Sequence, residues 1–212
     1  MTRDRELVGG LEPFLSALAG GDPTPGGGAV AALAGALAAA LGSMVGNLTI
    51  GRPRYAAVES RFRDEVAALA EARREFSELA IRDAEAFEGY MAALKLPKDG
   101  DEAKARRREA LRAASLAATE VPMATLRRAA SLLPAVEYAA AEGNAHAVSD
   151  AGIAALLVET AVRAAGMNVA INLGSLAPAD RERIAAELDA LTNEALPRAR
   201  AVAARVEEAL RS

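Results

Sequence analysis

The sequence predicts an all-α fold, and three observations support this. Apolar residues make up 52% of the chain, but aromatic residues only 3% and Trp is absent, so the core must be built from Ala, Leu and Val. Alternating β-branched runs typical of strands are lacking. A largely apolar run rich in Ala, Leu and Gly, residues 29–50, is too long for a strand. We therefore expect one domain over residues 1–212, a multihelical bundle around a buried, Ala/Gly/Leu-rich central helix.

The central run could be buried in two environments. Its length and the Gly42-x-x-x-Gly46 spacing fit a membrane span. However, Ala and Gly supply most of its apolar content, and Ser43 and Asn47 interrupt its last turns. We therefore favour a core helix and no membrane, with Gly35, Gly42 and Gly46 letting neighbouring helices approach almost backbone to backbone.

The segment before the central helix predicts a short helix followed by a break. Residues 5–20 place three leucines on one side, as an amphipathic helix would. Residues 22–25, DPTP, cannot be helical, because each proline moves its predecessor out of the α region. Gly26, Gly27 and Gly28 then stand at the start of the central helix. Their free N–H groups could meet an anion or a flat ligand, or the helix start could pack against another helix or subunit.

Residues 55–94 predict a long helix with an apolar stripe, in which one position holds an acid. Asp83 lies seven residues after Phe76, in line with the stripe, whereas Glu85 and Glu88 fall on the solvated side. A carboxylate in that place must be paired or carry a raised pKa. It is either a structural acid at a helix crossing or a general acid–base group.

The C-terminal half predicts further helices separated by Pro and Gly. A helix from Asp101 should be broken or restarted at Pro122 and interrupted again at Pro134. The basic run 106–108 is expected to pair with nearby glutamates or face water. A solvated helix from residue 178 or 180 to about 211, with a kink at Pro197, ends the pattern.

The segment 143–150, GNAHAVSD, gathers polar residues around His146. Gly143 is expected to end one helix in the αL conformation, and Ser149 and Asp150 to cap the next, residues 151–165. The clustering of these residues makes the segment a candidate binding site as well. Further along, Asn168 and Asn172 are one turn apart in an apolar segment, so they tie helices together or hold a polar ligand edge.

Composition narrows the classes of function. The net charge of −4, with acids and bases interleaved, gives no basic patch for nucleic acid. Cysteine is absent and His146 is the single histidine, so we expect no disulfide and no metal. Residues 1–12 carry mixed charges without the apolar core of a signal peptide. A cytoplasmic protein is expected.

Five segments of the chain resemble a known family in their order and sequence. They are PTPGGGAVAALAGALAAALGSMVGNLT, RDAEAFEGYMAALKLPK, EVPM, GNAHAVSDAGIAAL and NVAINL. This pattern resembles the formiminotetrahydrofolate cyclodeaminase and methenyltetrahydrofolate cyclohydrolase family, over residues 11–176. The resemblance implies a multihelical fold, an intertwined homodimer and folate one-carbon chemistry without a bound cofactor or metal. One departure is Ala29, where the family often has Ser.

The resemblance also implies a reaction and a catalytic residue. The acid of the family's DAEAF motif falls on Asp83. The main expectation is conversion of 5-formiminotetrahydrofolate to 5,10-methenyltetrahydrofolate and ammonia, with Asp83 protonating the leaving nitrogen for a gain of ~10²–10⁴-fold. Alternatives are a methenyltetrahydrofolate cyclohydrolase giving 10-formyltetrahydrofolate, and a non-catalytic helical assembly module. The family includes the C-terminal domain of formiminotransferase-cyclodeaminase, so a formiminotransferase is a candidate partner.

The expected substrate-binding residues rest on residue type and position. The backbone of the three glycines would meet the folate, and cations would meet its glutamate carboxylates. The remaining polar groups could face a cavity or pterin edges, or could simply pack helices and cap them. The candidates are Gly26, Gly27, Gly28, Ser43, Asn47, Arg52, Arg54, Lys95, Asn144, Ser149 and Asp150.

Overall fold

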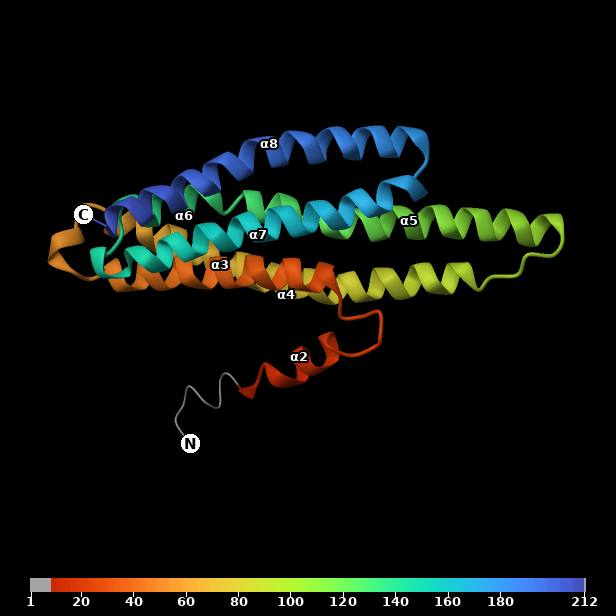
Figure 1. Ribbon diagram of the computed structural model, residues 1–212, viewed down its shortest axis with the longest axis horizontal. Coiled ribbons are helices and arrows are strands. Elements are labelled where there is room, and N and C mark those ends of the chain that lie inside the picture. The colour runs from red at the N-terminus through yellow and green to blue at the C-terminus, as the bar shows by residue number, and fades with distance from the viewer. Residues whose placement is uncertain (1–8, 212) are drawn as a thin grey trace.

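The computed structural model describes residues 9–211 as an elongated bundle of roughly antiparallel helices (Figure 1). These residues contain no strand, so the all-α prediction is confirmed. The helices are α2 (Glu12–Leu18), α3 (Gly27–Thr49), α4 (Glu59–Leu94), α5 (Asp101–Ala130), α6 (Leu133–Glu142), α7 (Val148–Asn172) and α8 (Pro178–Ala209).

Helix α3 is the central helix, packed mainly between α4 and α7. Its buried residues are almost all Ala and Gly, because only small side chains fit where helices lie so close. One side remains uncovered: Leu37 is 48% exposed and Met44 38% exposed. The prediction of a central core helix is therefore confirmed, although burial around the described α3 is incomplete.

A seven-residue register aligns α3 with α4 and positions the acid. A Cβ added to Gly35 would overlap the Phe76 ring, and one added to Gly42 would lie 3.0 Å from Leu69. Gly28 lies seven residues before Gly35, and Asp83 lies seven residues after Phe76. Gly28 and Asp83 are also in contact. The glycines thus receive large side chains of α4, which corrects the expectation that helix backbones would meet there. Asp83 takes the place of the next core side chain, at the start of α3.

The predicted break at Pro122 is wrong, because α5 runs through this residue. Proline has no N–H, so the carbonyl of Ala118, four residues earlier, loses its helical partner. The side chain of Asn172 on α7 replaces it, since its Nδ2 donates to the Ala118 oxygen at 3.0 Å. An amide from another helix thereby replaces the hydrogen bond that the interior proline removes. The predicted interruption at Pro134 is confirmed, since Pro134 lies in the first turn of α6.

Several helix boundaries differ from those expected. Helix α4 begins at Glu59, because residues 53–55 form a 3₁₀ turn. Helix α7 begins at Val148, so Ser149 lies within its first turn and does not cap it. Gly143 has φ of −75° and is not αL. It is required because a Cβ would overlap the Ala139 carbonyl.

Helix α8 is anchored to the bundle by ion pairs, and it runs as one helix through Pro197. Arg127 of α5 donates from Nε and Nη2 to Glu187, at 2.5 and 2.8 Å. Arg198 of α8 donates in the same bidentate manner to Glu137 of α6, at 2.8 and 2.9 Å. These paired hydrogen bonds hold the pKa of both glutamates below the usual range. The helix expected to be merely solvated is thus fixed in orientation.

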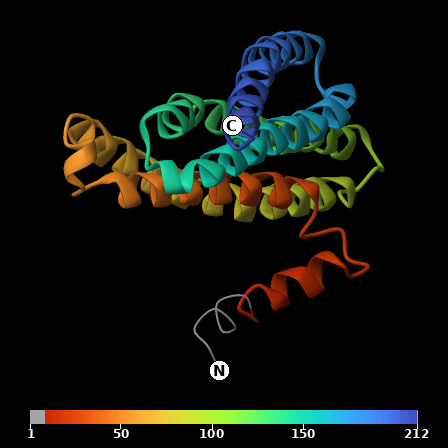
Figure 2. The ribbon, with the colours of Figure 1, turned by 60° about the vertical axis from the view of Figure 1, so that its left-hand side comes forward.

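Helix α2 lies apart from the bundle (Figures 1 and 2). It contains no buried residue, and Leu11 and Leu15 are each 49% exposed. Part of the helix predicted over residues 5–20 lies outside the described residues. The connection from α2, residues 19–26, leads directly to the start of α3.

Two helical segments of the described chain have the length and hydropathy of a membrane span. They are Gly27–Thr49, of whose most apolar window 61% is buried in the fold, and Ala145–Ser175, with 44%. Burial against other helices accounts for the apolar character of the first, as expected of a core helix.

Candidate active site at the start of helix α3

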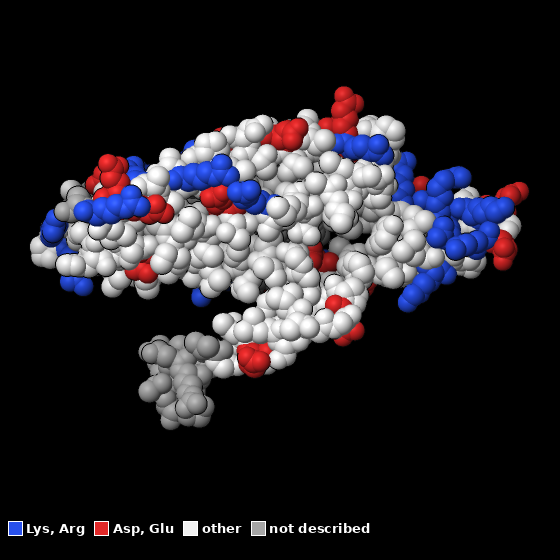
Figure 3. Space-filling model, viewed as in Figure 1, with Lys and Arg blue, Asp and Glu red and all other residues white. Residues whose placement is uncertain are grey.

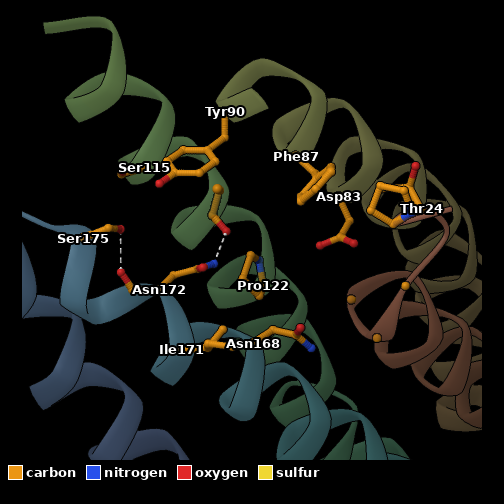
Figure 4. Close-up of a pocket in the computed structure, with 15 residues that line it drawn as sticks. Thr24, Asp83, Phe87, Tyr90, Ser115, Pro122, Asn168, Ile171, Asn172 and Ser175 are labelled. Carbon is orange, nitrogen blue, oxygen red and sulfur yellow. Dashed lines mark hydrogen bonds between the residues drawn. The ribbon is translucent and has the colours of Figure 1, made fainter. Parts of the chain in front are cut away.

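A cavity of about 390 Å³ lies where α3 begins, a size suited to a small organic ligand. It is enclosed by the segment before α3, by α4 and α5, and by the end of α7 with its following turn (Figure 4). Its lining residues are Pro23, Thr24, Gly26, Gly27, Gly28, Asp83, Phe87, Tyr90, Ser115, Ala118, Pro122, Asn168, Ile171, Asn172 and Ser175. The three glycines and Asp83, predicted separately, therefore line one cavity.

Asp83 is the acid of this cavity, and its carboxylate points toward the space between the helices (Figure 4). The side chain is half-buried, whereas Glu85 and Glu88 are exposed, as the stripe predicted. Burial raises the pKa of Asp83, and a hydrogen bond from the Ala29 backbone N–H opposes this in part. Among the described residues, no Lys, Arg or His forms a salt bridge with Asp83. An acid with a raised pKa and room beside it is suited to donate a proton to a bound ligand and to recover it.

The glycines let Asp83 and a ligand approach the first turn of α3. A Cβ on Gly28 would overlap the carboxyl group of Asp83, so any larger residue would displace the acid. Gly27 and Gly28 are the first two residues of α3, and their amides have no partner within the helix. The cavity floor is thus bare backbone with N–H groups, suited to a flat or electron-rich ligand.

Uncharged polar side chains also line the cavity, beside apolar groups such as Phe87 and Pro122. Asn168 and Asn172 come from α7, Tyr90 from α4 and Ser115 from α5. The sequence had marked the two amides, but Tyr90 and Ser115 were missed. Tyr90 could have been found, because it lies seven residues after Asp83 in the same stripe. Ser115 gave no such signal, since it lies in a helix rich in alanine.

A basic groove of about 760 Å³ adjoins the cavity and shares Tyr90, Ser115 and Ser175 with it. The cations that line the basic groove are Lys98, Lys104, Arg107, Arg108 and Arg112. Figure 3 shows blue side chains gathered at this end of the molecule. The interleaved charges of the sequence predicted no basic patch, and this prediction is wrong, because the helical turn brings residues 104, 107, 108 and 112 to one side of α5.

Of the two expectations for the arginine run, facing water is the one that the structure bears out, since Arg106 and Arg108 are exposed. Among the described residues, Arg106, Arg107 and Arg108 form no salt bridge. Arg107 instead donates to the carbonyl of Leu94 at the end of α4, at 3.3 Å. Its Nε is buried without a hydrogen-bond partner in the described structure. Positive charge in the basic groove is therefore not neutralised by neighbouring acids.

Several candidate residues lie away from this cavity in the single chain. Ser43 and Asn47 share a separate shallow hollow with Arg73, between α3 and α4. Arg52 is exposed and donates to the Leu48 carbonyl. Lys95 is exposed just after α4. Their roles in binding stay predictions.

The remaining candidates lie near the other end of the bundle. Asn144 is 7% exposed, and its groups contact Thr49, Leu48 and His146, so it joins α3 to the start of α7. Ser149 and Asp150 lie in the first turn of α7, and Arg54 faces the ring of its neighbour Tyr55. The described residues contain no cluster of His, Cys, Asp or Glu that could hold a metal ion.

The fold and cavity define an all-helical protein with one acid at the start of a glycine-initiated central helix. Residues 10–194 match the family described as formiminotransferase-cyclodeaminase. The methenyltetrahydrofolate cyclohydrolase of Methylorubrum extorquens is 41% identical over 78% of this chain and 80% of its own. A crystal structure of formiminotetrahydrofolate cyclodeaminase from Thermotoga maritima matches with a TM-score of 0.81, at 33% identity over 93% of both chains. The chain belongs to the formiminotransferase-cyclodeaminase family.

Relatives of a second kind are longer. The formimidoyltransferase-cyclodeaminase of Sus scrofa is 37% identical over 93% of this chain, but this match spans 37% of the pig protein. The chain thus corresponds to about a third of that relative's length.

Proposed function

We propose that this protein is an enzyme of folate one-carbon metabolism, and that it converts 5-formiminotetrahydrofolate to 5,10-methenyltetrahydrofolate and ammonia. The observation that carries the proposal is Asp83: a half-buried acid with a raised pKa, held against bare backbone in a ligand-sized cavity. The relatives named as cyclodeaminases, at 33% and 37% identity, support this reading. An exposed Asp83 would have favoured a non-catalytic assembly module, and its burial argues against that alternative.

In this reaction Asp83 acts first on the leaving nitrogen. The N10 amine attacks the formimino carbon, forming a C–N10 bond and a tetrahedral carbon, and N10 loses its proton as the formimino nitrogen gains one. Protonated Asp83 then gives its proton to this nitrogen, the C–N bond breaks, and ammonia leaves with the electron pair. The carbon is left as the methenyl cation shared by N5 and N10. The half-buried site favours the protonated acid before the step, which is the form required.

Hydration of the methenyl carbon is the second candidate function, and the Methylorubrum relative named as a cyclohydrolase favours it. Here Asp83 must begin as the carboxylate and accept a proton from the attacking water. It then returns the proton to N5 as the C–N5 bond breaks, while the hydroxyl group on the carbon loses its remaining proton to solvent and becomes the formyl C=O, giving 10-formyltetrahydrofolate. The two reactions therefore require opposite starting states of the same carboxyl group.

The basic groove is the proposed site for the glutamate carboxylates of the folate. It opens from the cavity beside Tyr90 and Ser115 and contains cations that no acid neutralises among the described residues. Guanidinium groups suit carboxylates because they can donate two parallel hydrogen bonds. This places the charged tail at Lys98, Arg107 and Arg108, away from the exposed Arg52 and Lys95.

A homodimer in the cytoplasm is the assembly that we propose, with the folate as the sole small-molecule partner and no bound cofactor or metal. The dimer is supported by apolar side chains that the single chain leaves exposed on α3 and α7, such as Leu37, Ile153 and Ile171. A separate formiminotransferase is a further proposed partner, since the pig relative combines both activities in its name.

Supplying each folate separately to the purified protein tests the proposal. Release of ammonia together with appearance of the methenyl absorbance from 5-formiminotetrahydrofolate would establish the cyclodeaminase. Loss of methenyl absorbance from 5,10-methenyltetrahydrofolate, above the uncatalysed rate and without formimino turnover, would establish the cyclohydrolase. A folded protein that accelerates neither reaction would refute the enzyme assignment.

A further inference from the structure

Asn168 and Asn172 lie one turn apart on α7, and both line the cavity, but their hydrogen bonds differ. The Nδ2 of Asn172 is used across the bundle, on the Ala118 carbonyl that Pro122 leaves without a partner. The Nδ2 of Asn168 is used within its own helix, on the Ala164 carbonyl at 2.9 Å. Asn172 therefore joins two helices, whereas Asn168 joins none.

The hydrogen bond to Ala164 fixes the orientation of the Asn168 amide. A carbonyl oxygen can only accept, so the amide nitrogen must face Ala164 and Oδ1 must face away. Among the described residues, Oδ1 accepts no hydrogen bond. Figure 4 shows the side chain directed from α7 toward the start of α3. Asn168 thus offers the cavity one oriented acceptor.

Asn168 and Asp83 stand at neighbouring points of the glycine floor. A Cβ on Gly27 would lie 3.6 Å from both Oδ1 and Nδ2 of Asn168, while one on Gly28 would meet Asp83. Successive helical residues point about 100° apart, so the two side chains face the floor from different sides. A flat bicyclic ring resting on the glycine backbone would have Asp83 at one edge and Asn168 at another.

We infer that Asn168 Oδ1 accepts hydrogen bonds from the pyrimidine edge of the substrate's pterin, its N3–H and 2-amino group. This inference rests on the proposed folate function. In a pterin, N5 and the one-carbon group lie on the edge away from the 2-amino group, so the reacting carbon faces Asp83 while the donor edge faces Asn168. Asn168 is accordingly a specificity-determining residue, and takes no part in the proton transfers.

The test is the ratio of kcat/KM between the natural substrate and the same folate with its 2-amino group replaced by methyl. The wild-type protein should favour the natural substrate by about three- to tenfold, the value of one or two neutral hydrogen bonds. Asn168→Leu removes the acceptor, so the ratio should fall to about one, with KM for the natural substrate raised and kcat little changed. Asn168→Ala, which also lacks an acceptor, is the second variant if Leu impairs folding.

Asn193→Leu, at an exposed asparagine of α8 outside the cavity lining, is the matched control. It should keep the wild-type preference for the 2-amino substrate. Folded Asn168 variants that retain the full preference would overturn the inference and leave the enzyme assignment intact. A wild-type protein that turns over neither folate would instead remove the proposed function, and the inference with it.

Discussion

Asp83 is the acid of the cavity, whereas neighbouring acids on the same helix face solvent. Two exposed glutamates on the same helix, Glu85 and Glu88, differ from it only in the side of α4 that they occupy. Because the stripe turns Asp83 inward, burial raises its pKa, and the Ala29 N–H that stabilises the carboxylate offsets only part of the effect. The inward position of this acid could be predicted from the apolar stripe, because helical spacing shows which side of a helix is buried even when the helices packed against it are not known.

The raised pKa has a consequence for stability. At a pH below the ordinary pKa of an aspartate, 3.8, Asp83 is protonated in both the folded and the unfolded state. Its ionisation then does not change the free energy of unfolding. As the pH rises through the raised folded-state pKa, the unfolded state loses its proton more readily, and folding loses stability relative to an uncharged side chain. The free energy of unfolding of Asp83→Asn, relative to wild type, should therefore increase as the pH rises above about 4.

Urea denaturation at several pH values measures this difference, with Glu88→Gln as the exposed control. The control difference should change little with pH over the same range. A difference for Asp83→Asn that stays constant, or that falls as the pH rises, would show that the carboxylate is not disfavoured by the fold.

At the scale of the element, the start of α3 depends on the absence of side chains. Gly28→Ala places a Cβ within the Asp83 carboxyl group, so the acid must rotate or α4 must shift. A displacement of about 1 Å can cost ~10²-fold in rate, so kcat should fall by about this factor. Gly89→Ala is the matched control on α4, because its Cβ meets nothing within 4 Å.

The Gly89→Ala control should keep full activity and gain roughly 0.5–1 kcal/mol in the free energy of unfolding, because Ala is the better helix former. Steady-state kinetics and urea denaturation of both variants supply the comparison. Equal activity of the two variants would mean that contact between Gly28 and Asp83 does not position the acid.

One hydrogen bond between α5 and α7, from Asn172 to the Ala118 carbonyl, can be tested separately from their packing. Asn172→Ala leaves the Ala118 carbonyl without its donor, so the free energy of unfolding should fall by about 1–3 kcal/mol. In the Pro122→Ala background the backbone N–H returns to the helix, and the cost of Asn172→Ala should largely vanish. This double-mutant cycle, measured by denaturation, fails if the two changes are simply additive.

The sequence could predict the helices but not these contacts between them. The central helix, the acid in the stripe and the interruption at Pro134 follow from local spacing and composition. The continuity of α5 through Pro122 does not, because it depends on Asn172, which is 50 residues away in the chain. The same limit explains why Ser43 and Asn144 were expected at the cavity but lie away from it. The sequence shows that these residues are polar, but it does not show which residues surround them.

At the scale of the whole molecule, the acidic chain carries a local positive end. The net charge is −4, but the basic groove collects cations from the α4–α5 turn and α5 beside the cavity. Its composition was visible as the run 104–112, but its position next to Asp83 required the packing of α4 on α5. A charged tail and a reactive ring can thus be held by separate parts of one site.

Charge removal tests the role assigned to the basic groove. Lys104→Ala combined with Arg108→Ala should raise KM about threefold to tenfold and leave kcat unchanged, because the tail is bound equally in the ground and transition states. KM should also become less sensitive to salt, since screening acts on these charges. Arg106→Ala, an exposed arginine outside the groove lining, is the control. A KM that changes equally in control and double variant would assign the effect to net charge alone.

The most direct test of the account is the kcat of Asp83→Asn with the folate that the wild-type protein consumes. The variant keeps the shape of the side chain but cannot exchange a proton, and we expect kcat to fall by ~10²–10⁴-fold with an unchanged helical circular dichroism spectrum. Glu88→Gln, on the solvated side of α4, should retain wild-type activity. A folded Asp83→Asn protein with near wild-type kcat would contradict the assignment of Asp83 as the catalytic acid.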